Sequence, residues 1–251
     1  MQRCVHPLAG TWSGTMNVSI HRTSEEGNRA AADWLARMLP SARNVMVAAG
    51  NTPLELYRLI GERKLNLSHL NIFALDEYVG VPLDEPRNCA NLLKGTVGEA
   101  WRIPPAQFHV ISSIEREALQ SVEHHEALIV KTGGIDLIVL GLGQNGHLGF
   151  NEPGSAEDST GRLLDLEQIS IDANRKWFDG KYAPAKGITV GLKTILSARH
   201  VLILAYGAHK TSAVKAMVEG KRGAQCPASF LQGHPNAHAF VDEAAAALVT
   251  K

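Results

Sequence analysis

The chain has 251 residues, of which 45% are hydrophobic and 20% are charged, enough to bury a sizeable core in one large α/β domain. Lysine and arginine together number 25, as do aspartate and glutamate, so the formal net charge is zero. A neutral chain argues against nucleic acid or an anionic membrane as the main partner. No apolar run approaches the roughly 20 residues that span a bilayer. The three cysteines are widely spaced and form neither a disulfide framework nor a zinc signature, which favours a cytoplasmic protein with cysteines as packing residues.

The order of apolar and amphipathic segments predicts the fold. Residues 1–20 lack a continuous apolar stretch and are expected to form a loose leader before a domain at 21–251. Strand-like runs then alternate with helical stretches, which is typical of a doubly wound, mostly parallel, Rossmann-like sheet in a single domain. The expected strands cover 45–49, 70–75, 108–112, 135–142, 201–206 and 237–241. The expected helices cover 23–39, a stretch beginning near Thr52, 114–131 and a stretch ending at Glu219.

Unusual residues follow four of the expected strands. These strand ends are Gly50-Asn51-Thr52, Asp76-Glu77, Asn145-Gly146-His147 and Gly207 to Lys210. Ligands bind beyond the carboxyl ends of the strands in an open parallel sheet. We therefore expect all four segments to meet at one edge of the sheet and to form a site there.

Two of these ends suit an anion. Thr52 as N-cap and Pro53 at the first helical position predict a helix start, where free backbone N–H groups and a hydroxyl can hold a phosphate. An ordinary capped turn explains the same residues. Lys210 stands at another helix start, where a lysine opposes the helix dipole unless it neutralises an anion. A solvated surface lysine explains it equally well.

Asp76 and Glu77 are adjacent carboxylates after an apolar strand. In an extended segment their side chains point to opposite faces, so only one of them can face a ligand. A carboxylate backed by an apolar strand can have a raised pKa and act as a base at carbon. From these residues alone, a helix cap or a salt bridge is an equally good explanation.

The segment GLGQNGHLGFNEP at 141–153 is rich in glycine, which allows tight turns and close approach of backbone to ligand. Its GLGxxG start superficially suggests a dinucleotide fingerprint, but that motif belongs in the first strand–helix turn, with an acidic ribose partner after it. His147 and Glu152 instead suit proton transfer at oxygen, the carboxylate orienting the imidazole. A pair that only ties the loop together fits the same residues, and no third ligand stands at metal-binding spacing.

Several motifs in this order resemble those of glucosamine-6-phosphate deaminases. They are LDEYVG at 75–80, GxGxxGHxxFNEP at 141–153, ITVG at 188–191 and a GxxK turn that ends at Lys210. The match extends from about Ala30 to Val241. The related 6-phosphogluconolactonases share a GxGxDGH element but typically continue toward SLFP, whereas this chain continues to FNEP. The wording GLGxNGHLGxNEP looks closer still to the branch called galactosamine-6-phosphate isomerase or deaminase.

The resemblance implies a reaction and the residues that carry it. Asp76 resembles the base that moves a proton between C2 and C1 of the sugar, and His147 resembles the residue that assists opening of the pyranose ring. Glu152 resembles the carboxylate that orients that histidine or relays protons with it. The implied reaction is ring opening, enolamine formation, reprotonation at C1 and hydrolysis to a ketose 6-phosphate and ammonia.

The resemblance also implies a phosphate site and the partners of the protein. The residues that match the phosphate turn and its cationic contacts are Gly50, Asn51, Thr52, Lys210 and Lys176. The expected partner is a small-molecule amino sugar phosphate, with no metal and no organic cofactor. A monomer and a homo-oligomer are both compatible with the resemblance.

Some positions depart from the family pattern. The glucosamine branch usually has Asp where Asn145 stands in the catalytic turn, so we count Asn145 among the candidate catalytic residues. It usually has Gly or Ser at Asn51 and Arg at Lys176.

The loop after Pro153 matches the place where hexameric relatives bind an N-acetylated activator. It keeps Ser155 and Arg162, but Leu164 stands where that pattern has a lysine, and the chain ends soon after the last expected strand. We therefore expect no activation by that compound.

Two other functions compete with a deaminase. A 6-phosphogluconolactonase-type hydrolase is disfavoured by the EYVG that follows Asp76 and by FNEP. A non-catalytic sugar-phosphate sensor normally carries a DNA-binding helix-turn-helix, and about 20 residues before the first helix are too few to hold one.

Overall fold

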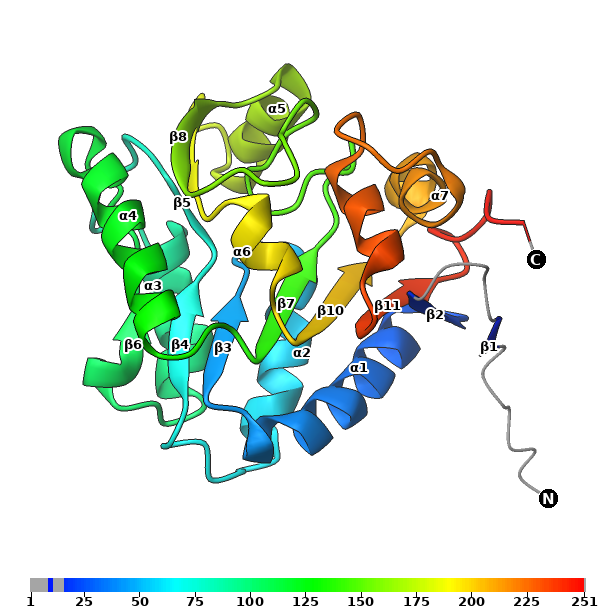
Figure 1. Ribbon diagram of the computed structural model, residues 1–251, viewed down its shortest axis with the longest axis horizontal. Helices are drawn as coiled ribbons and strands as arrows, with labels where there is room; N and C mark the ends of the chain where they lie inside the picture. Colours follow the sequence, from blue (N-terminus) through cyan, green and yellow to red (C-terminus); the bar gives the residue numbers. More distant parts are fainter. Residues whose placement is uncertain (1–8, 11–15, 251) are drawn as a thin grey trace.

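An eight-stranded sheet forms the centre of the computed structural model, which describes residues 9–10 and 16–250 (Figure 1). The strand order is β1-β2-β11-β10-β7-β3-β4-β6, and every neighbouring pair is parallel except β1 with β2. The predicted doubly wound, mostly parallel sheet in a single domain is confirmed. The strands are β1 (Ala9–Gly10), β2 (Asn17–His21), β3 (Asn44–Val47), β4 (Asn71–Ala74), β6 (Phe108–His109), β7 (Leu137–Gly141), β10 (His200–Ala205) and β11 (Ala237–Asp242).

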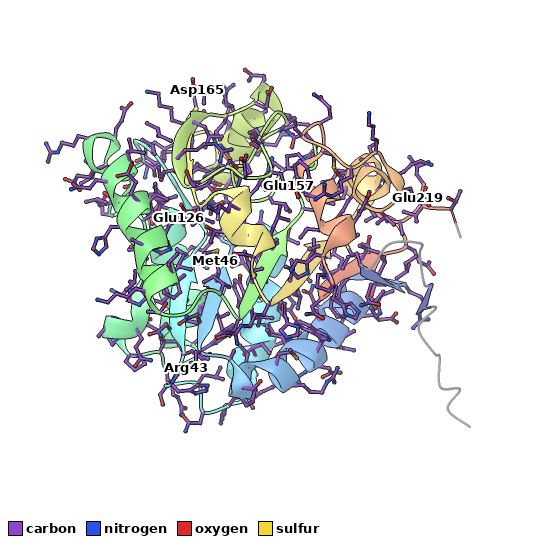
Figure 2. The ribbon with its side chains drawn as sticks, viewed as in Figure 1. Arg43, Met46, Glu126, Glu157, Asp165 and Glu219 are labelled. Carbon is purple, nitrogen blue, oxygen red and sulfur yellow. The ribbon has the colours of Figure 1, made fainter. Side chains whose placement is uncertain are left out.

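Helices cover both faces of this sheet, and α5 (Gln168–Trp177) lies above the carboxyl ends of the strands (Figure 1). One face carries α1 (Ser24–Met38), α2 (Asn51–Glu62) and α3 (Cys89–Leu93), and the other carries α4 (Glu115–Lys131), α6 (Leu192–Leu196) and α7 (Thr211–Glu219). Alternate residues of β3 serve the two cores: Val45 and Val47 pack on the first face, and Met46, labelled in Figure 2, packs on the second. This is why the central strands are apolar throughout their length.

A second, three-stranded antiparallel sheet stands beside the carboxyl edge, and the sequence did not predict it. Its strands are β5 (Asp76–Tyr78), β9 (Lys186–Thr189) and β8 (Arg162–Asp165). Glu126 on α4 (Figure 2) holds this sheet: its carboxylate accepts the N–H of Gly161 at 2.7 Å, the N–H of Gly191 at 3.0 Å and the hydroxyl of Thr194 at 2.7 Å. The register sets Asp76 opposite Thr189, so the ITVG segment supports the strand that carries Asp76.

The expected boundary of the leader at residue 20 is wrong. Residues 17–21 form β2, which pairs in parallel with β11, so the sheet begins inside the stretch assigned to a leader. The alternating Val18 and Ile20 were too short a run to stand out from the sequence alone. Residues 1–8 and 11–15 lie outside the described part of the chain. Within the described part, no helix combines the length and the apolar character needed to cross a lipid bilayer.

Helix starts agree with the sequence at α1 and differ at α2. The Thr23 hydroxyl accepts the N–H of Glu26 at 3.2 Å, which is the predicted cap of α1. Helix α2 begins at Asn51 with Gly50 as its N-cap, at φ 102°, so Thr52 is not the cap. The Thr52 hydroxyl is therefore left for another partner. The strand expected at 108–112 is shorter and ends at His109.

Short helical turns complete the chain. They are the 3₁₀ segments Leu39–Ser41, Pro105–Gln107, Ala208–Lys210 and Pro227–Gly233 and the π segment Lys94–Glu99.

Candidate active site

A cavity of about 180 Å³ lies at the carboxyl edge of the main sheet, under α5. Residues from all four strand ends singled out in the sequence line it: Thr52, Asp76, His147 and Lys210. The expected convergence on one edge is therefore what the structure shows. Other lining residues are Tyr78, Cys89, Gly143, Gln144, Phe150, Ile169, Ser170, Ala173 and Asn174.

Asp76 is the first residue of β5, just beyond β4, and the residue is only 7% exposed. Burial, and then the neighbouring charge of Glu77, raise the pKa of Asp76 to about 7. The backbone of Gly149, at φ 59°, passes so close that a β-carbon there would lie 3.2 Å from Asp76 Oδ2 and 2.8 Å from Thr189 Oγ1. This glycine lets the turn after β7 lie directly against the carboxylate. A carboxyl group with a pKa near neutrality is suited to take up and release protons.

Glu77 points away from the cavity, as the extended backbone of β5 requires. Its carboxylate accepts the N–H of Tyr78 at 2.7 Å, of Cys89 at 3.0 Å and of Ala90 at 2.8 Å, so it anchors the start of α3. The thiol of Cys89 contacts the carboxylates of both Asp76 and Glu77, and burial raises the pKa of Cys89 well above its usual value. Cys89 is buried, as expected of a packing residue, but it also forms part of the cavity wall.

His147 packs against Gly143, where a β-carbon would lie 2.3–2.5 Å from atoms of the imidazole ring. Nδ1 of His147 lies 3.2 Å from Glu152 Oε2, so the turn forms the predicted pair. Asn145 Nδ2 donates to the same oxygen at 2.7 Å, and Asn145 Oδ1 accepts the N–H of His147 at 3.3 Å. Asn145 therefore serves both members of the pair.

Ser170 joins this cluster from α5, and sequence reasoning missed it. Its hydroxyl lies 2.5 Å from Glu152 Oε1 and 3.4 Å from His147 Nδ1. Burial would raise the pKa of Glu152, but hydrogen bonds from His147, Ser170 and Asn145 outweigh it and leave that pKa lowered. A single serine in an amphipathic helix carries no motif, so no signal in the chain marked it.

Thr52 and Lys210 both line this cavity, and their hydroxyl and ammonium groups are of the kind that suits an anion. Lys210 Nζ donates to the carbonyl oxygen of Leu142 at 2.6 Å, and burial lowers the pKa of Lys210 to about 8. No carboxylate in the described residues forms an ion pair with this ammonium group. A phosphate could supply the missing negative charge.

The other predicted phosphate residues lie apart from Lys210. Asn51 and Lys176 line a second, adjoining cavity of about 710 Å³, which shares Gln144, Ile169 and Ala173 with the first. Gly50 lines neither cavity and serves as the N-cap of α2. The structure thus divides the predicted phosphate set between an inner group beside Asp76 and an outer group.

The donor set offers little to a metal ion. Within residues 9–10 and 16–250, no three His, Cys, Asp or Glu side chains are grouped so that they could hold one. The chemistry that the cavity supports is proton transfer by Asp76 and His147 beside a cation that can neutralise a phosphate.

The chain is similar to proteins of known name over most of its length. Residues 22–240 match the model of a family described as glucosamine-6-phosphate isomerases/6-phosphogluconolactonase. The glucosamine-6-phosphate deaminase of Cutibacterium acnes is 38% identical over 94% of this chain and 93% of the relative. The enzyme of that name from Rhodopirellula baltica is 41% identical over 82% of this chain and 84% of the relative.

Two solved structures share the fold. A monomeric glucosamine-6-phosphate deaminase superimposes with a TM-score of 0.88 at 28% identity, covering 92% of this chain and 99% of the other. The 6-phosphogluconolactonase of Trypanosoma brucei gives a TM-score of 0.77 at 20% identity, covering 95% and 100%, which shows a common fold alone. The family match, the relatives and the shared architecture agree, and this chain belongs to the family of glucosamine-6-phosphate isomerases and 6-phosphogluconolactonases.

Proposed function

We propose that the protein converts an aminohexose 6-phosphate to a ketose 6-phosphate and ammonia. The observation that carries this proposal is Asp76, a buried carboxylate with a pKa of about 7, across one cavity from the His147–Glu152 pair. The relatives named glucosamine-6-phosphate deaminase make glucosamine 6-phosphate the first substrate to test.

Ring opening is assigned to His147. The ionised Glu152 can only accept hydrogen bonds, so the neutral imidazole carries its proton on Nδ1, facing Glu152 Oε2. Nε2 then has the free lone pair. It takes the proton of the anomeric hydroxyl and returns it to the ring oxygen as the bond between C1 and that oxygen breaks. The product is the open-chain aldehyde, and the histidine ends as it began.

Isomerisation is assigned to Asp76. The ionised carboxylate removes the proton from C2, the aldehyde oxygen takes a proton from solvent, and an enolamine with a C1–C2 double bond forms. Asp76 then delivers its proton to C1, which gives an iminium cation at C2. Water adds to the iminium carbon, ammonia leaves and one proton returns to solvent, giving the ketone. One carboxyl group that both takes and gives a proton needs a pKa near the working pH, as burial provides here.

Lys210 and Thr52 are proposed to hold the phosphate, with Asn51 and Lys176 as outer contacts. Lys210 is the cation already desolvated in the cavity that contains Asp76, so its attraction for a phosphate is weakly screened by solvent.

A lactonase needs no base at carbon, because hydrolysis of a lactone proceeds by addition of water at the carbonyl. The raised pKa of Asp76 therefore favours the deaminase.

Cys89 and Cys226 are free thiols, and a cytoplasmic location remains part of the proposal.

The test is release of ammonia by the purified protein from glucosamine 6-phosphate and from galactosamine 6-phosphate, with hydrolysis of 6-phosphogluconolactone measured in parallel. Turnover of an aminohexose phosphate supports the proposal, and the ratio of kcat/KM values identifies the preferred epimer. Lactone hydrolysis without ammonia release assigns the rival function. No turnover of any of the three would favour the non-catalytic sensor.

A further inference from the structure

Ser170 belongs to neither the motifs nor the expected catalytic residues, yet it contacts the acid–base pair directly. We propose that Ser170 is a positioning residue whose hydroxyl, brought by α5, fixes the Glu152 carboxylate that orients His147. This inference rests on the proposed function for its kinetic consequence, but its structural content does not depend on the substrate.

The hydrogen bonds around Glu152 divide between its two oxygens. Oε2 receives Asn145 Nδ2 at 2.7 Å and faces His147 Nδ1 at 3.2 Å. Oε1 has the Ser170 hydroxyl at 2.5 Å. In the described part of the chain, Ser170 is the one side chain that donates to Oε1. A carboxylate held at one oxygen can still rotate about its last bond, and a donor on the second oxygen stops that rotation.

The direction of the Ser170 hydrogen bond follows from charge. Glu152 is ionised and accepts only, so the single hydroxyl hydrogen of Ser170 goes to Oε1. The lone pairs of Ser170 Oγ then lie 3.4 Å from Nδ1 of His147 and favour a hydrogen on that nitrogen. Ser170 and Glu152 thus support the same imidazole tautomer, the one with Nε2 free toward the cavity.

Ser170 comes from a different segment of the chain than the three residues around it. Asn145, His147 and Glu152 come from one turn after β7, whereas Ser170 lies 18 residues beyond Glu152 on α5. Ser170 is 4% exposed, and its helix also places Ala173 and Asn174 in the cavity wall. The seating of α5 over the sugar and the alignment of the acid–base pair are therefore coupled through one hydroxyl.

The far end of α5 is fastened separately. Arg87 donates to the carbonyl oxygen of Trp177 at 2.6 Å, and Trp177 Nε1 donates to the carbonyl oxygen of Arg87 at 3.0 Å. Because this end of the helix is held without Ser170, removal of the Ser170 hydroxyl frees Glu152 without detaching α5. Alanine is also a better helix former than serine, so Ser170→Ala should fold.

The experiment compares Ser170→Ala, Ser170→Thr and Gln168→Ala. Thr keeps a hydroxyl at position 170. Gln168→Ala removes the 2.9 Å hydrogen bond to Asp172 on the exposed side of the same helix and leaves Glu152 untouched. The kinetic readouts are kcat, KM and the pH profile of ammonia release. The spectroscopic readout is the ¹⁵N NMR signal of the His147 ring nitrogens in the substrate-free protein, which distinguishes the two tautomers.

For Ser170→Ala we expect kcat to fall roughly 10-fold, the lower end for loss of a hydrogen bond to a charged group, with KM within about twofold. The acid limb of the profile should move upward, because Glu152 loses a donor that stabilises its ionised form. His147 is the titratable side chain that contacts Glu152 in the described residues. The Nε2–H tautomer should gain population. Ser170→Thr should stay within about threefold of wild type, and Gln168→Ala should match wild type.

Three results would overturn the inference. An unchanged His147 spectrum in Ser170→Ala rules out positioning. A change in KM alone assigns Ser170 to the cavity wall, and equal losses in Ser170→Ala and Gln168→Ala assign the effect to helix α5 as a whole. If the wild-type protein releases no ammonia, the proposed function fails while the nitrogen spectra still decide the role of Ser170.

Discussion

Different physical effects set the pKa values of ionisable groups in two parts of the cavity: burial in one and hydrogen bonding in the other. On the floor formed by β5 and the turn after β10, burial raises the pKa of Asp76 to about 7 and lowers the pKa of Lys210 to about 8. In the turn after β7, hydrogen bonds overcome burial and lower the pKa of Glu152. All three groups are largely removed from solvent, so burial alone does not explain the difference.

The number of donors explains it. The two oxygens of Glu152 have three donors around them, from Asn145, Ser170 and His147. The carboxylate of Asp76 has the thiol of Cys89, which is a weak donor. Groups in the turn are satisfied before a ligand arrives, and they hold geometry. Within the residues that the structure describes, Asp76 and Lys210 lack an oppositely charged partner, and in the proposed reaction the substrate supplies what each lacks: a proton from carbon for Asp76 and a phosphate for Lys210. Environment, and not residue type, divides the roles of the two carboxylates.

The largest expected effect is at Asp76. Asp76→Asn keeps the size of the side chain but removes the proton acceptor, so kcat for ammonia release should fall by about 10² or more. Binding of a phosphorylated inhibitor should change little, because Lys210 is intact. A variant that kept more than about half of wild-type activity would remove Asp76 from the role of carbon base.

The same substitution tests the electrostatic cost of the floor. The pKa of Asp76 is higher in the folded protein, at about 7, than its ordinary value of 3.8, so between these pH values the folded state retains a proton that the unfolded state has lost. The free-energy cost of burying the ionised Asp76 carboxylate is absent below about pH 4, where the group is protonated in both states, and fully present above about pH 7. The free energy of unfolding of Asp76→Asn, relative to wild type, should therefore be higher at pH 8 than at pH 4, by on the order of 1 kcal/mol or more. Equal differences at the two pH values would show that burial of Asp76 carries no such cost.

Lys210 should give the next largest effect. Lys210→Ala should weaken binding of the phosphorylated substrate by roughly 1.5–3 kcal/mol, the range for a charge-assisted contact, and should hardly affect an unphosphorylated amino sugar. Lys176→Ala, in the outer cavity, is the matched comparison and should cost less, since solvent screens a more open site. Equal losses for both sugars would point to a folding defect instead.

The pH dependence of binding sharpens this result. Because the pKa of Lys210 is lowered to about 8, the charged form that attracts phosphate is lost as the pH rises through that value. The affinity of wild type for a phosphorylated inhibitor should therefore fall above about pH 8, beyond any change caused by the phosphate itself. Lys210→Arg, whose guanidinium stays charged, should lose that extra fall. Parallel curves would mean that Lys210 does not bear the phosphate charge.

The sequence predicted the site residues at the strand ends better than Ser170, which α5 contributes from above the cavity. Asp76, His147 and Lys210 stand at strand ends, and sheet topology alone brings such residues to one edge. Ser170 could not be predicted, because its role depends on how α5 packs over the turn, which no local pattern encodes. The start of α2 was misplaced because a capping threonine and a glycine cap produce similar local sequences. The small sheet was missed because its partners, Asp76 and Thr189, are far apart in the chain.

Asn145→Asp tests the satisfied cluster, with a smaller effect. Asn145 donates to Glu152 and accepts from the backbone of His147, and Asp keeps only the second contact while adding a negative charge beside both side chains. That charge stabilises positive charge nearby, so the pH profile of ammonia release should move to higher pH by up to about one unit. Asn145→Ser, which adds no charge, is the control. Superimposable profiles would leave residue 145 with a role in shaping the turn alone.

The smallest expected effect concerns activation by an N-acetylhexosamine 6-phosphate. Ser155 and Arg162 match the pattern described in the sequence analysis, but their polar groups are already paired: Arg162 Nη2 donates to Ser155 Oγ at 2.7 Å and Arg162 Nη1 donates to Asn151 Oδ1 at 2.8 Å. Leu164 on β8 offers no donor. A phosphate bound at this place would have to break the hydrogen bonds of Arg162. In exchange it would gain an ion pair with that one guanidinium group, so little net attraction remains. Saturation curves with and without an N-acetylhexosamine 6-phosphate should superimpose, and a leftward shift on its addition would show that the pocket works without a lysine at position 164. Arg162 donates to Asn151, which precedes Glu152 in the chain. Such a shift would therefore also show that a distant ligand acts through the turn that carries Glu152, and not through Asp76 and Lys210.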